Sequence, residues 1–329
     1  MNLDDPKHFK ELDSLDMLGE IEGLPAQLQA AWELGQGLPL PDIADPTCIV
    51  ISGMGGSAIG ADLAAAAVAA ACPAPVIVHR DYGLPAFARG KSTLMIASSH
   101  SGNTEETLDS FETARKQGCT IMAVTTGGEL AKLAGQHGYP VWTFAHEGQP
   151  RAAVGFSFGL LLATLSRLKL TPDPGRELQG AVTAMQQYQA ELRADLPATQ
   201  NAAKRYAGQL VGRWVTVFGA DLLAPVARRM KTQINEIAKA AAGFELLPEA
   251  NHNTLAGTLH PEEVMMPHTM NLFLRAPSDH PRNRKRLELT RQAFMLDGLN
   301  TDFIDARGDS PLAHMWTAIL FGDYMAYYL

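Results

Sequence analysis

Residues 98–107 read SSHSGNTEET and connect a predicted strand to a predicted helix. The apolar residues 94–97 precede it and predict a buried parallel strand. Apolar residues then recur every three or four positions after the stretch, which predicts an amphipathic helix. Gly102 suits the positive φ of a tight turn, and Asn103, with Glu106 three residues later, predicts a helix cap. The stretch therefore combines a strand end, a polar loop and a helix start.

The chemistry of this loop favours an anion as its ligand. A helix N-terminus gathers free backbone N–H groups and the positive end of the helix dipole. Ser99, Ser101 and Thr104 add three hydroxyl groups that can donate to oxygen. Phosphate is the ligand that such a geometry binds best. An ordinary capped turn explains a single loop of this kind at least as well as a phosphate site does. A second loop of the same kind would favour the phosphate site.

A second strand, loop and helix of this kind occur earlier in the chain. Residues 48–51 predict a short buried strand, residues 52–57 form the glycine-rich loop, and an alanine-rich helix is expected from Ala58. The loop also satisfies the dinucleotide fingerprint, with Asp81 as the ribose acid. A dinucleotide site has no use for a second hydroxyl-rich loop, however. Two such loops at a topological switch point favour one shared phosphate.

Strands alternate with helices through the whole chain. Strands are predicted at 48–51, 75–79, 94–99, 120–124, 139–144, 214–219, 269–274 and 301–306. Helices are predicted at 152–170, which is apolar nearly all round, and at 282–296 and 311–328. The alternation predicts an α/β fold of two doubly wound parallel-sheet domains, flavodoxin-like with three αβα layers. We expect the domains to span residues 1–152 and 153–329.

Composition narrows the classes of function. The chain has 329 residues, of which 46% are hydrophobic and 19% charged, as in globular proteins. The formal net charge of −8 argues against a nucleic-acid partner. Cys48, Cys72 and Cys119 lie far apart, which argues against a disulfide framework or a zinc knuckle and fits a reducing cytoplasm. Neither a signal peptide nor a membrane-spanning run is expected.

The histidines give little support to a metal site. His260 and His268 lie eight residues apart with two prolines between them, and no closely spaced pair of histidines occurs. This spacing does not suit metal ligation on one helix face. We therefore expect neither a metal nor a cofactor.

Together, GMGGSAIG at residues 53–60 and SSHSGNTEET resemble the sugar isomerase (SIS) domain, and specifically the bifunctional phosphoglucose/phosphomannose isomerase family. Three later segments sharpen the resemblance: PRAA at 150–153, NEIAK at 235–239 and LPEANHN at 247–253. The resemblance covers essentially the whole chain and keeps the order of the motifs. Either loop alone would indicate only some sugar-phosphate domain.

The resemblance implies two SIS-type domains in a homodimer that interconverts aldose and ketose 6-phosphates without metal or cofactor. By position, the phosphate would be held by Gly55, Gly56, Ser57, Ser99, Ser101 and Thr104. Glu236 would move a proton between C1 and C2 of the sugar. Arg151 would stabilise the enediolate, and His252, contributed across the dimer interface, would help to open and close the ring.

Chemistry makes these residue types sensible, although each also has a plainer interpretation. A proton next to a carbonyl is weakly acidic, so its removal needs a positioned carboxylate and a fixed cation near the developing oxyanion. Without the resemblance, Glu236 could face water and pair with Lys239 one turn on. Arg151 could be a surface arginine at a hinge, and His252 could cap a turn.

Two departures from the family pattern bear on function. His100 stands where the family loop usually has tyrosine. The lysine that the family usually carries in a tail beyond the last helix is missing after Leu329. Either the chain is truncated, or the activity is lost, or another cation substitutes. Two alternatives to a glucose 6-phosphate isomerase thus stay open: a sugar-phosphate-binding or regulatory SIS protein with little turnover, and an isomerase of another phosphosugar.

Overall fold

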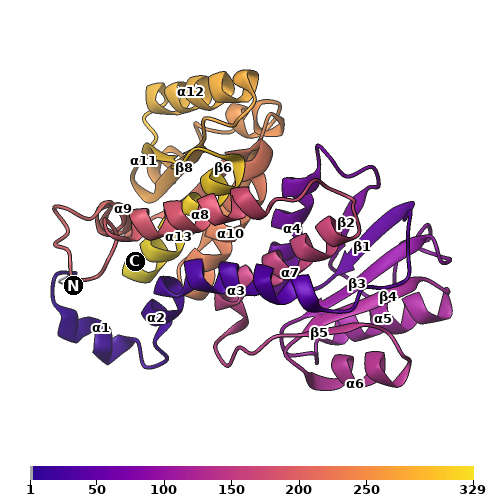
Figure 1. Cartoon of the computed structure of the whole chain (residues 1–329). Coiled ribbons are helices and arrows are strands. Elements are labelled where there is room, and N and C mark those ends of the chain that lie inside the picture. Colours follow the sequence, from indigo (N-terminus) through magenta and orange to yellow (C-terminus); the bar gives the residue numbers. More distant parts are fainter. Residues whose placement is uncertain (1–2) are drawn as a thin grey trace. The chain divides into compact units, whose positions relative to one another are not determined.

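A computed structural model of the chain describes residues 3–329 (Figure 1). The chain forms two compact units. Leu24–Arg176 make the first-sheet unit, and the residues up to Gly23 together with Glu177–Leu329 make the second-sheet unit. Each unit contains one parallel sheet with helices against it. The predicted α/β class with two parallel sheets is confirmed.

The first sheet has five parallel strands in the order β2-β1-β3-β4-β5, which is the predicted flavodoxin-like order. The strands are β1 (Cys48–Ser52), β2 (Val76–His79), β3 (Thr93–Ser99), β4 (Thr120–Thr125) and β5 (Val141–Thr143). The helices of this unit are α3 (Leu24–Gly37), α4 (Gly55–Val68), α5 (Glu105–Lys116), α6 (Gly128–Gln136), η1 (Pro150–Ala152) and α7 (Val154–Arg167). Helices α5 and α6 cover one face, and α4, backed by α7, covers the other (Figure 1).

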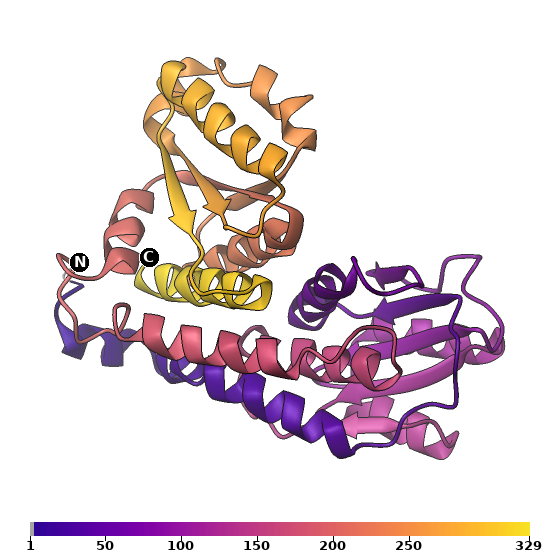
Figure 2. The same ribbon diagram turned by 45° about the horizontal axis from the view of Figure 1, so that its top comes forward.

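The second sheet has four parallel strands in the order β7-β6-β8-β9. The strands are β6 (Trp214–Ala220), β7 (Ala242–Leu247), β8 (Thr269–Arg275) and β9 (Thr301–Asp305). The helices and turns of this unit are α1 (Pro6–Leu12), α2 (Met17–Glu22), α8 (Gly175–Gln189), which starts at the boundary, α9 (Ala202–Leu210), η2 (Asp221–Leu223), α10 (Ala224–Glu236), η3 (Glu249–Asn251), η4 (Thr254–Ala256), α11 (Glu262–His268), α12 (Pro281–Leu296) and α13 (Pro311–Tyr328). Figure 2 shows α12 and α13 on opposite sides of these strands.

The compact units divide at a different place from the predicted boundary at residue 152. Helix α7, which we assigned to the second domain, packs on α3 and α4. Two glycines permit this close packing, because a Cβ on Gly155 would lie 2.7 Å from Gln27 Oε1 and one on Gly159 would lie 2.7 Å from Ala31 Cβ. The helix is apolar nearly all round because its own unit encloses it. The first-sheet unit therefore extends to Arg176.

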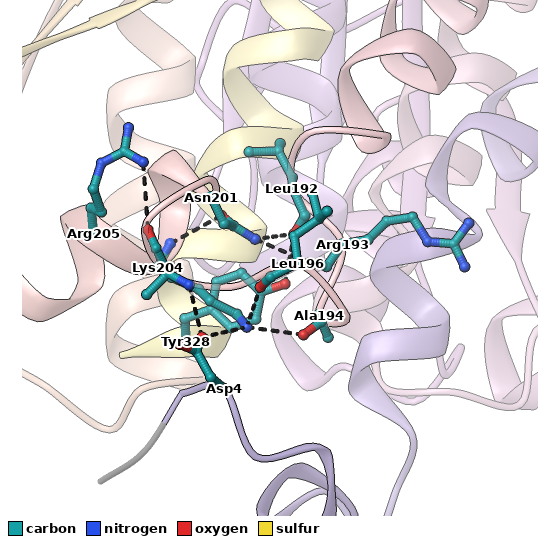
Figure 3. A network of polar contacts seen from close by, with 10 residues as sticks. Asp4, Leu192, Arg193, Ala194, Leu196, Asn201, Lys204, Arg205 and Tyr328 are labelled. Carbon is teal, nitrogen blue, oxygen red and sulfur yellow. Dashed lines mark hydrogen bonds and ion pairs between the residues drawn. The ribbon is translucent and has the colours of Figure 1, made fainter.

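A buried lysine holds the chain ends of the second-sheet unit together (Figure 3). Lys204 Nζ donates to the carbonyls of Ala194 at 2.9 Å and Leu196 at 2.7 Å, and it lies 3.4 Å from Asp4 Oδ1. The same ammonium sits 5.5 Å from the ring centroid of Tyr328 on α13. Burial lowers the pKa of Lys204, whereas Asp4 raises it. Lys204 thus links the N-terminal segment to the last helix.

An enclosed ion pair fixes α10 against α13. Arg229 Nη2 donates to Asp323 Oδ2 at 2.8 Å, and both side chains are almost fully buried. Burial raises the pKa of Asp323, and the Arg229 guanidinium opposes that rise. Charges this deep are costly unless both partners stay in place. Because Arg229 lies two turns before Glu236 on α10, the pair also sets the rotation of the helix that presents Glu236.

We predict that Asp323→Ala destabilises the second-sheet unit by about 3–5 kcal/mol, because Arg229 is left charged and buried without this carboxylate. The measurement is urea unfolding followed by tryptophan fluorescence, since Trp214 and Trp316 both belong to this unit. Asp305→Ala is the control: it removes a bond to Arg275 from a side chain that is 60% exposed, and we expect less than about 1 kcal/mol. Equal losses of unfolding free energy in the two variants would contradict the importance of burial for the pair of Arg229 and Asp323.

Candidate functional site

The two predicted loops lie side by side at the switch point of the first sheet. Strands β1 and β3 are parallel neighbours, with Ser52 paired to Ala97, so both end at the same edge. The backbone N–H of His100 donates to Ser57 Oγ at 3.1 Å, which joins the two loops directly. A Cβ on Gly53 would lie only 2.7 Å from Ser98 O. The adjacency expected from the two motifs is confirmed.

The three predicted hydroxyl groups gather in the loop after β3. Ser99 Oγ lies 2.8 Å from Thr104 Oγ1 and accepts the Gly102 N–H at 3.1 Å. Ser101 Oγ accepts the Asn103 N–H at 3.2 Å. Ser99 is buried, Thr104 is half-buried and Ser101 is exposed. The three hydroxyl groups therefore differ in burial, from a buried one at the sheet edge to an exposed one.

Two helices begin at this edge without a side-chain cap. Helix α4 starts at Gly55, three residues before the predicted start, and its N-cap Met54 makes no side-chain capping bond. Helix α5 starts after Thr104, which makes none either. Gly55 has a φ of +49° and is exposed, and Gly56 is half-buried. Two first turns with this geometry can donate backbone N–H groups to one anion.

Asn103 caps a different helix from the one that we predicted. We expected it to cap α5, but its Oδ1 accepts the backbone N–H of Glu129 at 3.0 Å, in the first turn of α6. Gly102, with a φ of +68°, makes this possible, because its backbone lies directly against Gly127 O. The loop after β3 is thereby fastened to the loop after β4. A local sequence pattern could not reveal this, because the two residues are far apart in the chain.

Arg151 belongs to the first-sheet unit and follows a segment that touches α4. It is half-buried in η1, between β5 and α7. A Cβ on Gly56 would lie 2.5 Å from Pro150 O and 3.6 Å from Arg151 Cα. On the other side, Gln27 Nε2 donates to Ala152 O at 3.0 Å. The structure thus brings the Arg151 backbone beside the first turn of α4.

Glu236 and His252 both belong to the second-sheet unit. Glu236 is the last residue of α10 and is half-buried. The ammonium of Lys239, whose φ is +57°, donates to the backbone carbonyl of Glu236 at 2.6 Å. This bond joins Lys239 to the main chain of Glu236, whereas the plainer interpretation had the two side chains pairing. His252 is exposed between η3 and η4, and its N–H donates to Glu249 O at 2.8 Å.

The switch point of the second sheet is lined by carboxylates, which sequence reasoning missed. Asp221 follows β6 and accepts the His280 N–H at 2.8 Å through Oδ2. Asp279 follows β8, is buried and accepts the Ala276 N–H at 2.7 Å. Burial raises the pKa of Asp279 to about 6, and the Asp221 carboxylate adds to the rise. Two acidic groups repel a phosphate, which makes the edge of the first sheet the better candidate for an anion site.

Other classes of site find no support in the part of the chain that the structure describes. Within residues 3–329, no group of three or more His, Cys, Asp and Glu side chains could hold a metal ion. Cys48, Cys72 and Cys119 are free thiols. Over the same residues, we find no helix with both the length and the apolar character needed to cross a membrane.

Two parallel α/β sheets, the first with paired glycine-rich and hydroxyl-rich loops at its switch point, define a protein of the SIS class. Residues 199–329 match the family described as bacterial phospho-glucose isomerase C-terminal SIS domain. Among solved structures, tagatose-6-phosphate ketose/aldose isomerase from Escherichia coli has the same fold, with a TM-score of 0.70 at 15% identity over 95% of this chain and 91% of that one.

Curated relatives specify the family. The bifunctional phosphoglucose/phosphomannose isomerase of Caldicellulosiruptor bescii is 37% identical over 321 residues, covering 95% of this chain and 92% of the relative. The protein of the same name from Thermoplasma acidophilum is 35% identical over 288 residues, covering 85% of this chain and 82% of the relative. The chain belongs to the bifunctional phosphoglucose/phosphomannose isomerase family, which confirms the resemblance seen in its motifs.

We predict that Gly102→Ala disrupts the loop after β3 and weakens the first-sheet unit. The positive φ alone costs an L-residue about 1 kcal/mol, and displacing the Gly127 backbone adds about 1–3 kcal/mol. Gly118→Ala is a matched control, because Gly118 has a φ of +72° but nothing within 4 Å of the added methyl group. Thermal unfolding of both variants checks this. An equal shift in midpoint would show that the contact with Gly127 does not matter.

Proposed function

We propose that the protein interconverts glucose 6-phosphate and mannose 6-phosphate with fructose 6-phosphate. The observation that carries the proposal is the pair of joined loops at the first switch point, with Arg151 next to them. A sugar phosphate needs an anchor for its phosphate and chemistry some distance away, at C1 and C2. The names of the two curated relatives support the choice of both aldoses.

The phosphate binds at the edge of the first sheet. The backbone N–H groups of Gly55 and Gly56 face the anion from the first turn of α4, with the Ser57 hydroxyl beside them. Ser99, Ser101 and Thr104 donate from the loop after β3. Hydroxyl and amide donors suit a phosphate dianion because they need no change of protonation. Ser101 is the exposed one of the three hydroxyl donors after β3 and is the first of them to meet the incoming ligand.

Proton transfer is the task of Glu236 and Arg151. The Glu236 carboxylate removes the proton from C2 of the aldose, which leaves an enediolate. A proton passes from the C2 hydroxyl to the oxygen of C1, and Glu236 returns its proton to C1 to give the ketose. The Arg151 guanidinium stabilises the negative oxygen of that intermediate. The reverse sequence converts fructose 6-phosphate to either aldose. Every proton that leaves carbon returns to carbon, so no redox partner is needed.

We place His252 in the active site of the second copy of a homodimer, where it helps to open and close the sugar ring. An imidazole suits this task because its two ring nitrogens can donate one proton and accept another. Its exposure supports the proposal, since a side chain that serves another copy must be accessible before assembly. Leu259, Val264 and Met266 follow it in the chain and are exposed apolar residues of the kind that interfaces cover. The free thiols support a cytoplasmic location.

We predict that Glu236→Gln lowers kcat by about 100- to 10,000-fold, the usual contribution of a general base. KM should change little, because the phosphate anchor is intact. The measurement is a coupled assay with each aldose phosphate, and Glu288→Gln, at an exposed position on α12, is the control. Full activity in Glu236→Gln would exclude this residue as the base. An unmodified chain that binds sugar phosphates without turnover would instead favour the regulatory alternative.

Mixed dimers test whether His252 serves the active site of its own chain or that of the other copy. We predict that Glu236→Gln and His252→Ala are each impaired alone, and that dissociating and reassociating a mixture restores activity. Each mixed dimer would then contain one site with both residues intact, so an equal mixture would recover about a quarter of the unmodified activity. If His252 serves its own chain, every site in the mixture lacks one of the two residues and no activity returns.

A further inference from the structure

His100 and His146 have no role in the mechanism above, although His100 lies inside the phosphate loop. His100 Nε2 and His146 Nδ1 are 2.9 Å apart, and the two rings meet almost at right angles. A contact of this length between two imidazoles is a hydrogen bond in which one ring donates and the other accepts. The bond joins the loop after β3 to the segment after β5. Sequence reasoning singled out His100 and missed His146.

The backbone of His100 is fixed on two sides. Its N–H donates to Ser57 Oγ at 3.1 Å, in the first turn of α4. Its carbonyl accepts the Thr126 N–H at 3.0 Å and the Thr126 hydroxyl at 2.7 Å, in the loop after β4. The position of the His100 ring is therefore set by the loops of three neighbouring strands. A partner bound to this ring takes its position from the phosphate site.

Aromatic rings flank the histidine pair. Phe144 and Phe156 stack with centroids 4.8 Å apart. The edge of Phe144 meets His100 at 5.9 Å, and Phe156 meets His146 at 6.0 Å. Such flanking limits access of water, and a hydrogen bond is stronger where water competes less. The pair is therefore a defined contact between two segments and not a chance approach of surface side chains.

The segment from His146 to Arg151 is held at two points. His146 is bound to His100 at one end, and Pro150 lies against Gly56 at the other. Residues 147–149, between these points, form no helix or strand. Arg151 comes directly after the second point. Loss of the first contact removes the bond that fixes the start of this irregular part to the loop after β3.

We propose that His100 and His146 are positioning residues, which transmit the geometry of the phosphate loop to Arg151. The inference rests on the proposed function, because Arg151 matters through the enediolate. A guanidinium displaced by about 1 Å from the developing charge can cost about 100-fold in rate. Loss of the bond between the two histidines does not move the phosphate donors, since Ser57 and Ser99 keep their own bonds. The histidine pair therefore acts on kcat and not on KM.

The test compares three variants of the full chain. His146→Leu removes the bond, whereas His146→Asn places an amide at the position of Nδ1 and can keep it. His137→Leu is the control, an exposed histidine at the end of α6 in the same unit. We measure kcat and KM for fructose 6-phosphate, together with amide hydrogen exchange in residues 147–151. If His146→Leu does not fold, His146→Gln replaces it, because its amide reaches the position of Nε2 instead.

We expect His146→Leu to lower kcat by about 10- to 100-fold with a nearly unchanged KM, and to speed exchange in residues 147–151. His146→Asn and His137→Leu should stay close to the unmodified chain. An unchanged kcat in His146→Leu, an equal loss in His146→Asn, or an effect on KM alone would overturn the inference. If the unmodified chain has no isomerase activity, the proposed function fails, and the exchange data alone decide whether His146 holds the segment.

Discussion

The candidate site depends on one constraint, the parallel pairing of β1 with β3. Because Ser52 and Ala97 share a register, both strands end at the same edge, with β2 on one side and β4 on the other. The connections that follow must leave in opposite directions, which opens a place for a ligand between them. Glycine at 53 allows the backbones to approach, and the bond from His100 N–H to Ser57 Oγ then closes the gap. Strand order thus creates the place for a ligand, and the side chains around it decide which ligand fits.

Much of this fold could be predicted because its signals are local. Continuous apolar runs, glycine-rich loops and amphipathic helices each lie within a short window, and they identified both parallel sheets. The boundary at residue 152 differed for a physical reason. The apolar pattern of α7 shows that the helix is buried but not that α3 and α4 bury it. Asn103 is a similar case, because its partner Glu129 becomes its neighbour only after β3 and β4 pair.

The residues of the candidate site also fall into those that local sequence patterns predict and those that they do not. The loops around Ser57 and Ser99 could be predicted, since strand, loop and helix follow one another in the chain. His146 could not be predicted, because a histidine after a short edge strand has no distinguishing pattern. Its proposed role depends on its contact with His100, which forms only in the folded chain. Asp221 and Asp279 also went unnoticed, although Asp221 directly follows β6 and Asp279 lies four residues after β8 at the second switch point. Glu236, Arg151 and His252 come from the resemblance and remain predictions.

The order of the segments in the chain has a consequence for biosynthesis. The first-sheet unit is continuous from Leu24 to Arg176, whereas the second-sheet unit begins before it and ends after it. During synthesis, the first-sheet unit is complete while Asp4 still lacks Lys204 and Tyr328 as neighbours. Asp4, which is made before the first-sheet unit, thus reaches these contacts only after that unit is complete. The loops around Ser57 and Ser99 can form on the ribosome well before the helix that carries Glu236 exists.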